Sequence, residues 1–176
     1  MDNSFFAYLQ QLEGMAFFSG YPLIYAVTLF ISGNQRVKNN FKSKIFSFLP
    51  FAYALTGTLY LALQLKNLYP DYSIENINLA IQRPYLVGWG LLSILFWVPV
   101  LAKKPVLSLL HSLVFFFFIA RDLFLDSFKS SVDKSIVRND MKIYTDSILL
   151  NMGALIVVGV IALLVSRFRK TITGPT

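Results

Sequence analysis

The stretch PVLSLLHSLVFFFFIARDLFL (residues 105–125) decides the fold class of this chain. It is 21 residues long, begins with a proline, and contains three ionisable side chains, His111, Arg121 and Asp122. An α-helix rises 1.5 Å per residue, so about 20 apolar residues cross a hydrocarbon core of ~30 Å. The stretch therefore predicts a membrane-spanning helix.

Four further apolar runs of similar length flank this stretch. They cover residues 15–31, 45–65, 84–102 and 147–165. The 176-residue chain is 56% hydrophobic and only 14% charged, which is far from the composition of an ordinary soluble domain. We expect an all-α fold: a multi-pass transmembrane helical bundle with five spans that forms a single integral membrane domain over residues 1–176.

The charges between the runs predict an orientation. If the N-terminus is outside and the C-terminus inside, the inner segments (32–44, 103–104 and 166–176) hold nine basic residues and no acidic one. The outer segments then hold six basic and eight acidic residues. Because Lys and Arg collect on the cytoplasmic side of membrane proteins, the pattern favours N-out and C-in.

Two outer connections show helical spacing of apolar residues. Residues 73–83 and 127–144 are therefore expected to form interfacial helices on the outer leaflet, with continuation of the fourth span as the alternative for the second stretch. Pro22, beside Gly20, and Pro99 are expected to kink the first and third spans.

Composition also excludes several classes of protein. The net charge of +7 lies in short clusters beside the apolar runs, which indicates contact with lipid headgroups and not with nucleic acid. The chain has no cysteine, so disulfides and thiolate sites are excluded, and no motif predicts a metal site. It also lacks an Asn-x-Ser/Thr sequon, which favours the cytoplasmic (inner) membrane of a bacterium.

His111 is the only histidine and lies within an apolar run. An ionisable side chain in a membrane is a functional candidate by default. Our main interpretation is a neutral imidazole hydrogen-bonded to Ser108 or to a neighbouring helix. The alternatives are a role in proton transfer and ligation of a haem or pigment, although bis-His haem ligation would need a second histidine. We therefore predict no cofactor.

The remaining candidate polar site lies at the outer ends of the spans. Arg121 and Asp122 are expected near the outer end of the fourth span, where a structural ion pair or a pocket for an ion or anionic headgroup can form. At the same depth we place three candidate partners. They are Glu13, Asp146 and the amide of Asn151.

Three functions fit these features. The leading hypothesis is a non-catalytic integral subunit of a larger membrane assembly, which docks partner subunits or copies of itself. The second is a small oligomeric transporter or channel whose route is lined by His111 and Asp122. The third is a membrane-embedded enzyme that acts on lipid or quinone, with Arg121 binding phosphate and His111 as base.

Overall fold

The computed structural model describes residues 14–33, 40–70, 72–73, 84–128 and 134–172. These residues form helices and no strand, so the predicted all-α class is confirmed for them. The elements in chain order are α2 (Tyr21–Gly33), α3 (Asn40–Leu68), α5 (Pro84–Leu91), the 3-10 helix η1 (Leu92–Trp97), α6 (Pro99–Ala102), α7 (Pro105–Phe128) and α8 (Lys134–Ile172).

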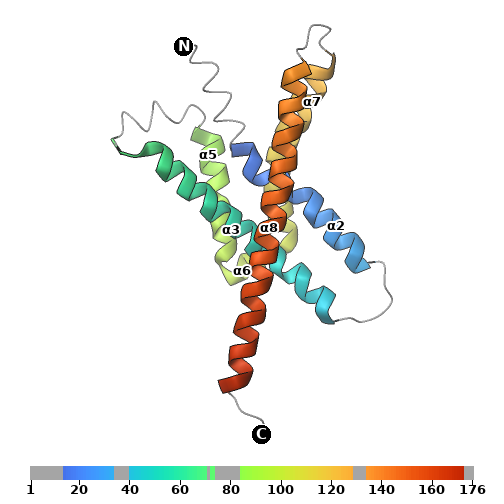
Figure 1. Ribbon diagram of the computed structural model, residues 1–176, viewed down its shortest axis with the longest axis vertical. Coiled ribbons are helices and arrows are strands. Elements are labelled where there is room, and N and C mark those ends of the chain that lie inside the picture. The colour runs from blue at the N-terminus through green and yellow to red at the C-terminus, as the bar shows by residue number, and fades with distance from the viewer. Residues whose placement is uncertain (1–13, 34–39, 71, 74–83, 129–133, 173–176) are drawn as a thin grey trace.

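Helix α3 is the centre of the fold and packs against each of the other described elements. Figure 1 shows α3 crossing the long helix α8, with α7 alongside the N-terminal half of α8 and α5 to α6 on the other side of α3. The C-terminal half of α8 extends beyond the rest of the bundle (Figure 1). The fold is therefore a crossed bundle and not a set of parallel rods.

Side-chain contacts show that α3 and the α5–η1 segment run antiparallel. A Cβ added to Gly90 would lie 2.7 Å from the ring of Tyr60, while the ring of Tyr53 lies 5.6 Å from that of Phe96 in an edge-to-face arrangement. The later residue of α3, Tyr60, thus meets the earlier residue of the α5–η1 segment, Gly90, as in an antiparallel pair. Gly90 allows this approach because it has no side chain to meet Tyr60.

The third apolar run, residues 84–102, is not one straight helix. Its α-helical part ends at Leu91, η1 follows, and Val98 is extended (φ −72°, ψ 123°) before Pro99 starts α6. Proline favours an extended residue before it and sits well in the first turn of a helix, which explains both the break and the restart. The expected kink at Pro99 is therefore present as a full interruption.

Helix α8 corrects the expectation for residues 127–144. Residues 134–144 are neither a separate interfacial helix nor an extension of the fourth run, because α8 continues from Lys134 through the fifth run to Ile172. There is no Gly or Pro between residues 134 and 152 to stop it. The other expected interfacial helix, residues 73–83, lies outside the described residues except for Ser73.

Two described helices are long and apolar enough to cross a membrane. They are Ile45–Leu68 and Met141–Phe168. Three other apolar helices are shorter and cover Gly14–Phe30, Pro84–Trp97 and Pro105–Arg121. Each of these five segments overlaps one of the five apolar runs of the sequence, and two of them have the length and hydropathy of a membrane span.

Candidate functional site

Three buried polar side chains, Ser19, Ser147 and Asn151, gather where the first apolar segment breaks. Residues 14–18 are helical, the chain turns at Ser19 and Gly20, and α2 begins at Tyr21. Pro22 favours the break, because it has no N–H to donate and its ring crowds the carbonyl four residues earlier, although α3 continues through Pro50. The break leaves backbone groups in the protein interior that need partners from another element.

Helix α8 supplies those partners. The Oγ atom of Ser147 accepts the N–H of Gly20 at 2.7 Å, and Nδ2 of Asn151 donates to the carbonyl of Phe17 at 2.9 Å. The same Nδ2 donates to the carbonyl of Ser147 at 2.8 Å, which fixes the orientation of the amide. Asn151 Oδ1 is then buried without a hydrogen-bond partner, as is Oγ of Ser19.

Gly20 is required for this contact. A Cβ at this position would lie 2.5 Å from the backbone nitrogen of Ile148 and 2.6 Å from the carbonyl carbon of Ser147. Backbone atoms cannot move aside as a flexible side chain can. The backbone at Gly20 therefore packs directly against the backbone of α8 at Ser147 and Ile148.

A second polar group surrounds His111 between α3, α5 and α7. The Tyr53 hydroxyl lies 2.6 Å from Nδ1 of His111, and the Trp89 ring stacks on the imidazole with centroids 4.8 Å apart and planes 5° apart. Trp89 Nε1 also donates to the carbonyl of His111 at 3.1 Å. The histidine thus joins three elements.

Next to this group, Tyr21 of α2 reaches α7. Its hydroxyl lies 2.7 Å from Oγ of Ser108, and its ring centroid lies 4.4 Å from that of Tyr53. Phe18, fully buried, stacks on Phe115 of α7 with centroids 4.7 Å apart. Aromatic packing and hydroxyl bonds together hold the first, second and fourth apolar segments.

The structure gives His111 the neighbouring-helix partner that the sequence analysis considered. That partner is Tyr53, whereas Ser108 is bonded to Tyr21. The Nε2 atom of His111 is buried without a hydrogen-bond partner, so it is the ring atom that remains for a proton or a ligand. No group of three or more metal-binding His, Cys, Asp or Glu side chains occurs in the described part of the chain.

Of the other predicted site residues, the structure describes the side chains of Arg121, Asp146 and Asn151, and Asn151 forms no hydrogen bond with either of the other two. The side chains of Arg121 and Asp146 are exposed, and Glu13 and the side chain of Asp122 lie outside the described residues. Asn151 does not accept a hydrogen bond from Arg121, because its Oδ1 has no partner. Asn151 and His111 bind different neighbours and belong to separate groups.

Sequence reasoning missed several residues of these groups. Tyr21, Tyr53 and Trp89 each sit in an apolar run where an aromatic side chain needs no explanation. Ser147 could have been found, because it precedes Asn151 by four residues and so lies on the same face of a helix.

No protein-family model, curated protein or solved structure matches this chain.

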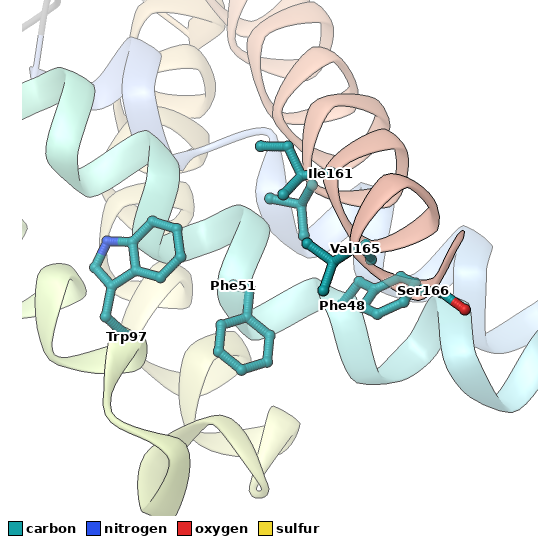
Figure 2. Close-up of a pocket in the computed structure, with 8 residues that line it drawn as sticks. Phe48, Phe51, Trp97, Ile161, Val165 and Ser166 are labelled. Carbon is teal, nitrogen blue, oxygen red and sulfur yellow. The ribbon is translucent and has the colours of Figure 1, made fainter. Parts of the chain in front are cut away.

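An apolar groove lies between α3, η1 and the C-terminal half of α8, beyond the point where α3 and α8 cross. It has a volume of about 720 Å³. Figure 2 shows the rings of Trp97, Phe51 and Phe48 along one side and Ile161, Val165 and Ser166 of α8 along the other. Trp97 is held by a hydrogen bond from Nε1 to Oγ1 of Thr58 at 3.0 Å.

The crossing of the two long helices explains the groove. Ala52 of α3 packs on Ala154 and Val158 of α8, and beyond this contact the helices diverge (Figure 1). Ala162 and Val165 follow Val158 by four and seven residues, so they continue the same face of α8. The face that is buried at the crossing is therefore uncovered in the groove.

The opposite face of α8 carries a second exposed apolar surface, which we call the outer α8 stripe. Its members are spaced by three or four residues and are exposed. They are Leu149, Gly153, Val157, Val160 and Leu164. A Cβ added at Gly153 would meet nothing within 4 Å, so this glycine serves no contact inside the described part of the chain.

Proposed function

We propose that the protein is a non-catalytic integral membrane subunit that binds another membrane protein through the outer α8 stripe. The observation that carries the proposal is the difference in burial between the two long apolar helices. In the most apolar stretch of Met141–Phe168 only 17% of residues are buried, against 44% in Ile45–Leu68. Of these two long helices in the described residues, the one with the more apolar stretch is thus the one less covered by the chain itself.

This exposure supports a bilayer location. The core helix of a soluble protein is covered by its neighbours, whereas a contiguous apolar surface on a monomer marks a membrane or a partner. Helix α8 is also ~58 Å long for its 39 residues, longer than a hydrocarbon core of ~30 Å. Its ends therefore reach beyond the core on both sides.

Five spans with the N-terminus outside and the C-terminus inside are consistent with the packing. The α5–η1 segment is antiparallel to α3, and the first apolar segment is antiparallel to α7, since Phe18 contacts Phe115 while Tyr21 contacts Ser108. If five spans cross the membrane in alternate directions, the second and third spans must be antiparallel, and so must the first and fourth. The inner loops would then carry the basic clusters, as in the cytoplasmic membrane of a bacterium.

The outer α8 stripe has the features of a helix-docking face. Small residues allow transmembrane helices to approach closely, and Gly153 leaves a notch flanked by the β-branched side chains of Val157 and Val160. The opposite face of α8 already binds the bundle through Ser147, Asn151 and Ala154. A partner helix can therefore bind the stripe without disturbing the fold.

The two alternative functions have less support. A transport route or an active site needs polar side chains that face a common path or substrate. The buried polar side chains here bond to groups on neighbouring elements, Asn151 to the carbonyl of Phe17 and Tyr53 to Nδ1 of His111. This arrangement fits a structural role in the bundle.

The test is purification from native membranes in mild detergent, followed by mass spectrometry, together with site-specific cross-linking. The chain has no cysteine, so single-cysteine variants can be made without other changes. Val160→Cys lies on the stripe, and Leu110→Cys on α7 is the matched control, since Leu110 is equally exposed. A bifunctional reagent should link the first variant to a partner and leave the second unlinked.

A stoichiometric complex that is lost in a Gly153→Leu variant supports the proposal. A protein that purifies alone from native membranes, with equal cross-linking of both variants, overturns it. A defined homo-oligomer linked through Val160→Cys would make a second copy of this chain the partner.

A further inference from the structure

We infer that the apolar groove between α3, η1 and α8 binds one acyl chain of a phospholipid with an anionic headgroup. The inference rests on the membrane location in the proposed function, but not on the docking of a partner helix. It concerns the groove of Figure 2 and not the outer α8 stripe, which lies on the opposite face of α8.

The shape and chemistry of the groove suit an acyl chain. Its volume of about 720 Å³ falls in the range of ligand pockets, about 300–1,000 Å³. Its walls are rings and aliphatic side chains, and the indole N–H of Trp97 is already bonded to Thr58. An apolar hollow that faces hydrocarbon loses dispersion contacts if it stays empty, so a lipid chain is stabilised there.

The charges that follow the groove residues along the chain select the headgroup. Trp97 leads through the short helix α6 to Lys103 and Lys104, whose side chains are exposed. On α8, Ser166 of the groove is followed directly by Arg167. Each basic residue near a membrane surface favours an anionic lipid by about fivefold in affinity.

The same charges argue against a second copy of the chain as the occupant. The three segments expected on this side, 32–44, 103–104 and 166–176, contain nine basic residues and no acidic residue. Two copies docked groove to groove would bring these like charges together, which is unfavourable. An anionic headgroup is attracted to the same residues.

The groove contains its own reporter. The chain has two tryptophans, so the Trp89→Phe variant leaves Trp97 as the single tryptophan, which is excited selectively over the tyrosines. This variant is reconstituted in phosphatidylcholine vesicles that contain the same small fraction of either brominated phosphatidylglycerol or brominated phosphatidylcholine. Bromine on the acyl chain quenches tryptophan only at close range.

We expect the brominated anionic lipid to reach half-maximal quenching of Trp97 at a mole fraction at least about fivefold lower than the brominated zwitterionic lipid. Lys103→Gln and Lys104→Gln should together remove most of this preference. Ala162→Phe, which fills the groove, should reduce quenching by the anionic lipid to the level of the zwitterionic lipid. Leu163→Phe is the matched control, because Leu163 is the next residue on α8 and is exposed outside the groove.

Equal quenching by the two lipids in the Trp89→Phe protein overturns the lipid site and leaves the membrane location intact. Quenching by neither lipid, with Trp97 emission that changes on dilution of the protein, overturns the lipid site in favour of a second copy. Quenching by neither lipid at any dilution overturns the membrane location as well. Failure of the subunit proposal appears only in the cross-linking experiment, so the two outcomes are distinguishable.

Discussion

The hydroxyl of Tyr53 lies 2.6 Å from Nδ1 of His111, and this bond links the central helix α3 to α7 in the protein interior. Either group can be the donor, and in both cases Nε2 of His111 is left without a partner. The bond thus satisfies one of the two ring nitrogens. It makes the only histidine of the chain a packing element of the bundle.

The first prediction concerns this bond. Tyr53→Phe should destabilise the protein by about 1–2 kcal/mol, because both ring nitrogens of His111 are then buried without partners. Thermal unfolding in detergent, followed by circular dichroism, measures the effect. The control is Tyr85→Phe, since the Tyr85 side chain is exposed.

The double variant Tyr53→Phe/His111→Leu refines this prediction. Replacing both partners by apolar groups removes the unpaired polar atoms, so the double variant should be more stable than the sum of the single changes implies. Additive effects of the two changes would show that the bond contributes nothing.

The second prediction concerns the side-chain amide of Asn151, which donates to the carbonyl of Phe17 beside the break in the first apolar segment. Asn151→Leu keeps the side-chain size but removes the bond to the carbonyl of Phe17, so the free energy of unfolding should fall by about 1–2 kcal/mol. Met152→Leu, at the exposed neighbouring position, is the control and should leave the unfolding midpoint unchanged. Equal midpoints for Asn151→Leu and Met152→Leu would refute a structural role for the amide.

The third prediction tests the close approach at Gly20. Gly20→Ala places a methyl group 2.5 Å from the backbone nitrogen of Ile148, so the chain must move away from α8 and the bond to Ser147 weakens. We expect a loss of about 1–3 kcal/mol in stability. Gly88→Ala is the matched control, because nothing lies within 4 Å of the new methyl group. A Gly20→Ala protein as stable as the control would contradict the contact.

The fourth prediction tests the proposed orientation. In a bacterial host, a membrane-impermeant maleimide should label Tyr72→Cys in intact cells and Lys104→Cys only after permeabilisation. Both side chains are exposed, so accessibility in the protein itself is matched. The opposite labelling pattern would invert the topology, and labelling of both in intact cells would contradict a span between them.

The sequence predicted the helical class because apolar runs near 20 residues long have few other uses. It also located the breaks at Pro22 and Pro99, since proline acts locally on the backbone that precedes it. Proline is not sufficient for a break, because α3 continues through Pro50. It did not predict that α8 continues back to Lys134. Hydropathy separates apolar from polar segments but does not mark where a helix begins. Residues 134–152 contain no Gly or Pro, so the helix continues through the polar residues that precede the fifth apolar run.

The candidate site was predicted less well, for a physical reason. The sequence marks ionisable residues such as His111 and Arg121, but hydrogen bonds between helices depend on which faces meet. The partner of His111 is Tyr53, 58 positions away, and the partner of Asn151 is a backbone carbonyl 134 positions away. Residue type cannot reveal either pairing, because three of the five apolar runs contain tyrosine and every run contains backbone carbonyls.

The crossing of α3 and α8 has a mechanical consequence. Helix α8 is one uninterrupted element that contacts α3 near Ala154 and Val158 and extends in both directions from that point (Figure 1). A rigid rod held near its middle behaves as a lever. Any tilt of α8 about this crossing would move its two ends in opposite directions, would strain the bonds of Ser147 and Asn151 to the first apolar segment, and would change the width of the groove beside Val165.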